Sequence, residues 1–235
     1  MLKIIIGIQA RSTSSRLPGK VFKLIDNKEM LMHVLDACQS AEKYINRGKD
    51  HWHAKTVLLV PEGDIIVRAY EQYCQIYQGS EEDVLSRFYN AAVEERADYI
   101  VRITSDCPLI PPFMISKCVN VAVKNIGDYT SNVDPICRTD PDGMDVEVLS
   151  MRALEWLHKS ATTPYDREHV TTLIRKIRPS IFQQLHVVGH FDYSVLKCSV
   201  DTEEDLIAVR KEYAGILEKL KKAKGTSGMR SVHRI

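Results

Sequence analysis

Short apolar runs and amphipathic stretches alternate along the first half of the chain. Leu2 to Ile8 is apolar except for Lys3 and Gly7, as is typical of a buried strand. Between such runs, apolar side chains recur three and four positions apart, which is the period of a helix with one buried face. Because strands that alternate with helices form βαβ units, the pattern predicts an α/β fold with a mostly parallel sheet and helices on both faces. The predicted strands of this half are 2–8, 56–60, 75–78 and 99–103, and the predicted helices are centred on 30–38, 65–73, 84–92 and 112–124.

The second half of the chain is less regular, above all between Tyr129 and Pro164. Two sequences match a capping box, in which a hydroxyl side chain and an acid three residues later close the start of a helix. They are Ser80 to Asp83, which places three acids in the first turn of a helix, and Thr202 to Asp205 before a long final helix. The polar segment 43–55 is predicted to be a surface loop. The remaining predicted elements are strands at 145–149, 181–188 and 198–200 and a helix at 166–176.

Composition narrows the class of protein. Lys plus Arg number 32 and Asp plus Glu number 31, so the net charge is +1, which argues against nucleic acid or a membrane surface as a partner. No apolar run approaches the roughly 18 residues that span a bilayer, and charge appears too early for a secretory signal. None of the six cysteines forms a CxxC pair, as expected of reduced thiols in a cytoplasmic protein. Without a repeat or linker, we expect one domain over 1–222 and a basic, flexible tail over 223–235.

A basic loop follows the first predicted strand. Residues 9–20, QARSTSSRLPGK, contain Arg11, Arg16 and Lys20, and no acid precedes Asp26. Ligands of open α/β sheets bind beyond the carboxyl ends of the strands, and Arg and Lys bind phosphate. The loop matches neither the GxxxxGK[ST] nor the GxGxxG pattern. It therefore predicts a site for a polyanion of another type, the alternative being a solvated basic surface loop.

Two aspartates are predicted at the same edge of the sheet. Asp106 comes just after the strand at 99–103, and Asp201 comes just after the short strand at 198–200. Mg²⁺ is bound through one or two carboxylates, phosphate oxygens and waters, so the pair suits a metal–nucleotide site. The alternatives are a turn aspartate before proline for Asp106 and a helix N-cap for Asp201.

At these residues the chain resembles the cytidylyltransferases that activate acidic sugars, which include the synthetases of CMP-sialic acid and CMP-Kdo. The resemblance is greatest to the branch of spore coat polysaccharide biosynthesis protein F and runs from about Lys3 to Val209. It implies the nucleotide-diphospho-sugar transferase fold, a three-layer α/β/α sandwich with a mixed sheet. Six motifs carry it in order: IQARSTSSRLPGKVF, GSEEDVLSRFYNAA, VRITSDCPLI, PDGMDVEV, PYDREHVT and SVDTEEDL.

The resemblance also implies the roles of individual residues. On the nucleotide side, Arg11, Ser14, Arg16 and Lys20 would contact the phosphates and ribose of CTP, and Arg87 falls at a position where the family often has an arginine. Asp106 and Asp201 would hold Mg²⁺; with Arg11 and Lys20 they form the expected catalytic set. The acceptor side would comprise Arg102, Asp145, Glu147, Arg167, Glu168 and His169.

The implied reaction joins CMP from CTP to a hydroxyl of a small acidic acceptor, of the nonulosonic-acid type, and releases pyrophosphate. His169 or a metal-bound hydroxyl would accept the proton, although His169 could equally be a structural residue. A carboxylate on the acceptor would need a cation, for which Arg102, Arg138 and Arg167 are candidates, or ordinary ion-pair residues. The alternatives are a sugar-1-phosphate nucleotidyltransferase that uses UTP or dTTP, and a noncatalytic binding protein.

Relatives of this fold commonly pair through an inserted arm, which predicts a homodimer here. The irregular segment 129–164 occupies the position of that arm and is rich in apolar residues, which is unusual for a solvated excursion. The alternative is that these side chains complete the core of the monomer. They are Met144, Val146, Val148, Met151, Leu154, Trp156 and Leu157.

Overall fold

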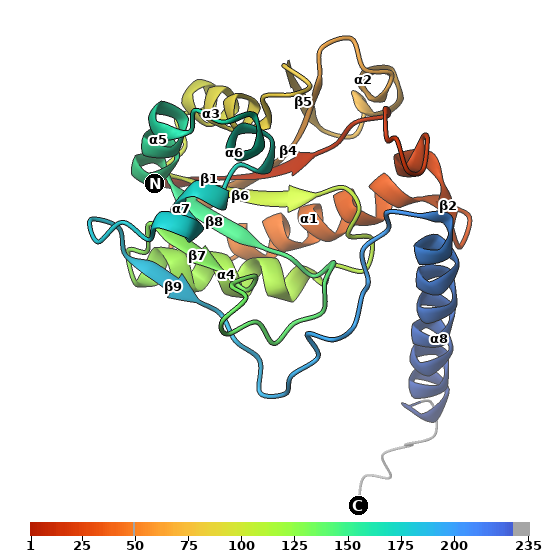
Figure 1. Ribbon diagram of the computed structural model, residues 1–235. Helices are drawn as coiled ribbons and strands as arrows, with labels where there is room; N and C mark the ends of the chain where they lie inside the picture. The colour runs from red at the N-terminus through yellow and green to blue at the C-terminus, as the bar shows by residue number, and fades with distance from the viewer. Residues whose placement is uncertain (49, 228–235) are drawn as a thin grey trace, which may run out of the picture.

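The computed structural model of the protein describes residues 1–48 and 50–227, and its centre is a seven-stranded mixed sheet between two layers of helices (Figure 1). The strand order is β5-β4-β1-β6-β8-β7-β9. Neighbours from β5 to β6 run parallel, β8 is antiparallel to both β6 and β7, and β9 is parallel to β7. The α/β class and the mostly parallel sheet are thus confirmed. The strands are β1 (Leu2–Gln9), β4 (Trp52–Pro61), β5 (Gln75–Gly79), β6 (Tyr99–Thr104), β7 (Tyr129–Ser131), β8 (Glu147–Ser150) and β9 (Gln184–His186), with a separate hairpin of β2 (Leu24–Ile25) and β3 (Lys28–Glu29).

The two helical layers follow from the alternation of side chains along each strand. In β1, Ile4 and Ile6 pack with α1 and α4 on one face, while Ile5 packs with α3 and α5 on the other. Because β1 is central, both of its faces are buried, which explains its nearly continuous apolar sequence. The helices are α1 (Met30–Asn46), α2 (Ile66–Tyr70), α3 (Val84–Glu95), α4 (Pro112–Lys124), α5 (Met151–Ser160), α6 (Pro164–His169), α7 (Thr172–Ile177) and α8 (Glu203–Ser227).

The surface loop predicted over 43–55 is wrong at both ends. Helix α1 continues to Asn46 because Ala41 and Ile45 extend its buried face, and β4 begins at Trp52, where it pairs with β1. The side chain of Asn46 accepts a hydrogen bond from the amide of Ala54 (2.6 Å) and donates one to its carbonyl oxygen (2.9 Å). The end of α1 and the start of β4 contain many exposed polar residues, so the hydrophobic pattern did not indicate either of them.

Helix α3 begins later than its predicted capping box. Asp83 is the N-cap and accepts a hydrogen bond from the amide of Ser86 (2.9 Å), whereas the Ser80 hydroxyl accepts one from the amide of Asp83 (3.0 Å). The first turn of α3 therefore contains no acid, and Glu81 lies in the preceding turn. The capping box of α8 is confirmed, since Thr202 and Asp205 accept hydrogen bonds from each other's amides.

Three elements of the second half differ from prediction. The helix predicted over 166–176 is broken into α6 and α7 at Val170, which has a φ of 61°. The strand predicted over 181–188 is reduced to β9, and 198–200 is not a strand. That segment is nevertheless buried, and the amide of Val200 donates to the carbonyl oxygen of Asp106 (2.9 Å), so tertiary contacts supply the bonds that a sheet would have supplied.

The segment 129–164 belongs largely to the body of the domain, because it contains β7, β8 and α5. Of the seven apolar side chains named above, four are buried in the chain's own core: Val146, Val148, Leu154 and Leu157. The alternative interpretation of its apolar composition therefore holds for most of the segment. Ile136, in the loop between β7 and β8, remains 81% exposed.

Helix α8 contacts the domain mainly through its first turns and projects away from the sheet (Figure 1). Leu206 and Val209 are buried there against Ile25 and Met30. The predicted tail begins inside this helix, and its residues 228–235 lie outside the described residues. Within the described part, no helix has the length and apolar character needed to cross a membrane.

Candidate active site

A cleft of about 500 Å³ lies beyond the carboxyl ends of β1 and β6. The loop after β1, the turn after β6 and the segment before α8 meet there, as predicted, although the last of these does not follow a strand. Eleven of the candidate residues line this cleft. They are Arg11, Ser14, Arg16, Lys20, Arg87, Arg102, Asp106, Asp145, Glu168, His169 and Asp201.

The loop after β1 is held in place at several points. The amide of Ser12 donates to the carboxylate of Asp64 (2.8 Å), and the carbonyl oxygen of Ser12 accepts from the amide of Gly19 (3.2 Å). Gly19 has a φ of 63°, which favours glycine, and turns the chain into the single 3-10 turn that begins with Lys20. Leu17 is buried in the small core shared with Val200 and α8. The loop after β1 and the segment before Asp201 are therefore held by packing in the same small hydrophobic core.

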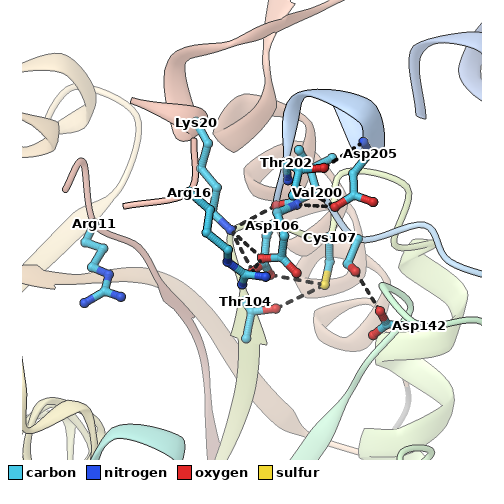
Figure 2. Close-up of polar contacts among 12 residues, drawn as sticks. Arg11, Arg16, Lys20, Thr104, Asp106, Cys107, Asp142, Val200, Thr202 and Asp205 are labelled. Carbon is cyan, nitrogen blue, oxygen red and sulfur yellow. Dashed lines mark hydrogen bonds and ion pairs between the residues drawn. The ribbon is translucent and has the colours of Figure 1, made fainter. Parts of the chain in front are cut away.

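Lys20 contacts both aspartates, and Figure 2 shows its side chain directed toward Asp106 and Val200. Its Nζ donates to Asp106 Oδ2 (3.0 Å), Asp201 Oδ1 (3.2 Å) and the carbonyl oxygen of Val200 (2.9 Å). An ammonium group has three protons, so these three acceptors satisfy it completely. Arg16 Nη2 also lies 2.9 Å from Asp201 Oδ1. Lys20 can contact a phosphate only by exchanging one of its present acceptors.

Asp106 is an ionised carboxylate in this arrangement. Removal from water raises its pKa, but the Lys20 ammonium and the hydroxyl of Thr104 outweigh that effect and hold the pKa below its usual value. Burial, together with the neighbouring carboxylate of Asp106, raises the pKa of Cys107. Cys107 is therefore a neutral thiol that donates weakly to Asp106 (3.6 Å), and it is no candidate nucleophile.

Asp106 and Asp201 have the chemistry of a magnesium site. Both carboxylates contact one positively charged nitrogen, so they already share a cation. Oxygen ligands suit Mg²⁺, which takes one or two carboxylates and completes its shell with phosphate oxygens and water. The described residues contain no group of three or more His, Cys, Asp or Glu that could hold a metal by protein ligands alone. The two aspartates thus fit a metal that arrives with a nucleotide.

The loop cations are compensated by acids from other segments, which the sequence around the loop does not contain. Arg11 lies 3.7 Å from Glu81 and 3.8 Å from Glu168. Arg87 is buried beneath the loop and donates to the carbonyl oxygen of Leu59 (2.8 Å), while its buried Nε has no partner within the described residues. Burial and the charge of Arg11 lower the pKa of Arg87 to about 10, so Arg87 stays cationic at neutral pH.

The acceptor side of the cleft is more acidic than the loop side. Asp142 and Asp145 both line it; Asp142 accepts a hydrogen bond from Ser199 (2.7 Å), and Asp145 pairs with Arg138 (2.5 Å). Burial raises the pKa of Asp145 although Arg138 lies beside it. His169 lines the cleft with its ring against that of Tyr165, 4.3 Å between centroids, and its ring forms no hydrogen bond with another described residue.

Three of the candidates, two arginines and one acid, do not line the cleft. Arg167 donates to Asp83 (2.7 Å) and to the carbonyl oxygens of His158 and Ala161 (3.1 Å each), so it joins the start of α3 to α5. Arg138 donates to Asp145 and to nearby carbonyl oxygens, and it does not line the cleft either. Glu147, 2% exposed, lies behind Arg102. The sequence motif places these residues near the site without showing which way they face.

The sequence analysis missed several residues that line the cleft. Gln9, Thr104 and Ser105 lie at strand ends next to predicted residues, so their position was a usable signal. Asp142 and Ser199 meet across two irregular segments, and Arg175 lies on α7. Asp142 and Ser199 belong to the motifs PDGMDVEV and SVDTEEDL, which were a usable signal, whereas Arg175 lies outside all six motifs.

The chain is similar to known proteins over most of its length. A model of the cytidylyltransferase family matches residues 4–224. An uncharacterized protein of Methanocaldococcus jannaschii is 32% identical over 206 residues, which are 87% of this chain and 80% of that protein. The spore coat polysaccharide biosynthesis protein SpsF of Bacillus subtilis is 28% identical over 218 residues, which are 91% of this chain and 87% of SpsF.

Solved structures agree with these matches. A cytidylyltransferase of Leptospira borgpetersenii has a TM-score of 0.78 at 27% identity, with 100% of both chains covered. Two others share the fold alone. CMP:2-keto-3-deoxy-manno-octonic acid synthetase complexed with CTP has a TM-score of 0.64 at 17% identity, covering 91% of this chain and 99% of that one. The complex of Rv0371c from Mycobacterium tuberculosis with manganese has a TM-score of 0.57 at 16% identity, covering 89% and 98%.

Proposed function

Since the chain belongs to the cytidylyltransferase family and is a nucleotidyltransferase, we propose that it transfers CMP from CTP to a hydroxyl of a small acidic sugar of the nonulosonic-acid type. Pyrophosphate is the second product. The observation that carries this proposal is that Lys20, Asp106 and Asp201 meet beside Arg16 in the cleft that Arg11 also lines. The similarity to SpsF supports a role in the biosynthesis of a surface polysaccharide or glycan.

The residues of the cleft divide the work of the reaction. Arg11, Ser14 and Arg16 bind the triphosphate and ribose, and Arg87 adds a fixed positive charge beneath the loop. Lys20 exchanges one of its three acceptors for a phosphate oxygen. Mg²⁺, held by Asp106 and Asp201, would supply charge neutralisation at the phosphates. Such transfers are accelerated mainly by positioning and by stabilising charge.

The chemical step forms one bond and breaks one. The acceptor hydroxyl attacks the α-phosphorus of CTP in line, and the bond from that phosphorus to the pyrophosphate oxygen breaks. We propose that His169 acts as the general base and accepts the proton of the hydroxyl. It lines the cleft, and its ring forms no hydrogen bond with another described residue. Glu168 neighbours Arg11 at the edge of the acceptor side, and Arg102 and Asp145 complete that side.

The reaction is tested by incubating the protein with Mg²⁺, each of the four nucleoside triphosphates and a set of acceptors. Pyrophosphate release and mass spectrometry of the product are measured. We expect a CMP-linked product from CTP with sialic, legionaminic or pseudaminic acid, and none from sugar 1-phosphates. A product from UTP or dTTP with a sugar 1-phosphate would assign the alternative enzyme class, and no product with any pair would favour a binding protein.

Nucleotide binding predicts a change in thermal stability. At about 100 times its Kd, CTP with Mg²⁺ should stabilise the protein by about 2.7 kcal/mol, because it binds only the folded state. Lys20→Ala should reduce this ligand-induced shift, each variant being compared with its own unliganded state. Lys23→Ala is the matched control, since Lys23 belongs to the same basic segment but pairs with Glu203 (3.9 Å) outside the cleft. Equal stabilisation by all four triphosphates would contradict selectivity for cytidine.

We propose that the enzyme acts as a homodimer in the cytoplasm. All six cysteines are free thiols in the structure, as a reducing compartment would keep them. Exposed Ile136 marks the remaining apolar surface of the segment 129–164. Light scattering at micromolar concentration should give twice the mass of one chain, and Ile136→Asp should lower it, whereas Ile65→Asp, at a site 61% exposed on another element, should not. A monomeric wild type would overturn the dimer, and a dimer unchanged by Ile136→Asp would place the contact elsewhere.

A further inference from the structure

A buried carboxylate lies directly behind the acceptor side of the cleft. Glu147 in β8 is 2% exposed, and its Oε1 accepts hydrogen bonds from the hydroxyls of Tyr129 (2.6 Å) and Thr171 (2.7 Å). Its Oε2 accepts from Arg102 Nη1 (2.5 Å), and Arg175 Nε lies 3.9 Å from Oε1. Both of these arginines line the cleft, whereas Glu147 does not. One carboxylate thus holds two guanidinium groups at the cleft wall.

The two guanidinium groups share a single carboxylate. Burial raises the pKa of Glu147, but Arg102 and Arg175 outweigh that effect and hold the pKa below its usual value, so Glu147 is ionised. The other two acids of this side, Asp142 and Asp145, pair with Arg138 (3.9 and 2.5 Å). Arg102 and Arg175 are therefore the arginines of this side that line the cleft, where an anion can reach them.

Several N–H groups of the two arginines have no partner among the residues that the structure describes. Arg102 Nε donates to Gln9 Oε1 (3.0 Å) and Nη1 to Glu147, while Nη2 donates to none of the described residues. The buried Nε of Arg175 forms no hydrogen bond with the residues that the structure describes, and its two Nη groups donate to none of them. A guanidinium with free N–H groups in a fixed plane binds a carboxylate through two parallel hydrogen bonds.

We propose that Arg102 and Arg175 together bind the carboxylate of the acceptor, and that Glu147 is a positioning residue that holds both. The inference rests on the proposed function and adds Arg175 and the role of Glu147 to it. A carboxylate has two oxygens that can accept a pair of parallel hydrogen bonds from such N–H groups. A phosphate, with up to two charges, is disfavoured by Asp142 and Asp145 on the same side of the cleft. The triphosphate has its own cations in the loop after β1.

Binding is measured as thermal stabilisation in the presence of saturating CTP and Mg²⁺. The probes are N-acetylneuraminate, legionaminate and pseudaminate, the methyl ester of each, and glucose 1-phosphate. We expect at least one free acid to stabilise the protein. Its methyl ester lacks the charge, so the ester concentration needed for half of the stabilisation should be at least about tenfold higher. Equal effects of acid and ester, stabilisation by glucose 1-phosphate alone, or no stabilisation by any acid would each overturn the carboxylate site.

Substitutions of Arg175 test whether this residue binds the acceptor. Arg175→Gln should raise the acceptor concentration needed for half-stabilisation, and the acceptor KM, by about 10- to 100-fold, with the KM for CTP unchanged. Arg175→Lys should restore part of the loss because it keeps the charge without the planar fork. Lys176→Gln, a neighbouring cation of α7 outside the cleft, is the control that should change neither value. Wild-type acceptor affinity in Arg175→Gln would remove Arg175 from the site.

The role of Glu147 is tested by measuring the acceptor KM and kcat of a variant. Glu147→Gln keeps the shape of the side chain and should raise the acceptor KM more than it lowers kcat, leaving the CTP-induced stabilisation unchanged. Should that variant not fold, the Arg175 variants decide the inference alone. If CTP itself fails to stabilise the wild type, the proposed function fails. If CTP stabilises and the acids act independently of Arg175, only this inference fails.

Discussion

Asp106→Asn should lower the rate of pyrophosphate release by at least about 100-fold, which corresponds to about 3 kcal/mol of lost transition-state stabilisation. The asparagine removes the negative charge that a divalent cation needs, and its carbonyl oxygen still accepts the hydrogen bond of Lys20, which lies 3.0 Å away. The fold should therefore survive. Steady-state rates at saturating CTP, acceptor and Mg²⁺, with circular dichroism for the fold, measure both expectations.

The control is a carboxylate–lysine pair outside the cleft. Asp36 accepts a hydrogen bond from Lys28 (2.8 Å) in the same way that Asp106 accepts one from Lys20, so Asp36→Asn should leave the rate unchanged. Asp201→Asn should resemble Asp106→Asn, and the double variant should lose little more than either single one, because the two carboxylates act as one unit. A folded Asp106 or Asp201 variant with near wild-type turnover would remove that residue from the metal site.

Gly143→Ala should lower the free energy of unfolding by about 2–4 kcal/mol and reduce activity as well. Gly143 has a φ of 98°, and a Cβ at this position would lie 2.3 Å from the amide nitrogen of Ser199 and 2.5 Å from the carbonyl carbon of Cys198. Backbone atoms cannot move aside as a flexible side chain can, so strain of overpacking adds to the cost of the left-handed conformation. The segment that the Cβ would displace, 198–199, leads directly to Asp201. The same substitution should therefore lower the stability and move Asp201 out of position.

Urea denaturation and the rate of pyrophosphate release test this second expectation. Gly63→Ala is the matched control: Gly63 also has a positive φ, 74°, but a Cβ there would meet nothing within 4 Å. That variant should lose only about 1 kcal/mol and keep its activity. If Gly143→Ala were no less stable than Gly63→Ala, the close approach of the two segments would not position Asp201.

Much of the architecture follows from the chain's own pattern. The buried strands β1 and β6 and the helices between them are visible as apolar runs and 3.6-residue periods, because each element buries a face whose residues are regularly spaced. The loop after β1 was also identifiable, since its cations and hydroxyls are consecutive. Asp106 was placed at this edge by the rule that parallel strands end together, because it follows β6, whereas Asp201 was placed there from a strand that the structure does not contain.

Other features have no local signal. The segment 198–200 is buried as a strand would be, yet its polar groups are satisfied by contacts with Asp106 and with the loop around Asp142 instead of a sheet. The capping box at Ser80 failed for a similar reason. Asp83 begins α3 and also receives the hydrogen bond of Arg167 from α6, far along the chain.

The sequence by itself determined the class of fold, the basic loop after β1 and the two aspartates for which we propose a metal. Tertiary structure alone decided what these residues contact. It compensated the cations of the loop with acids from other segments, saturated Lys20 with three acceptors, and set Arg102 and Arg175 on one buried carboxylate. Periodicity along the chain shows which local stretches are buried. Ion pairs depend instead on residues that are distant in sequence, such as Lys20 and Asp201, which are 181 positions apart.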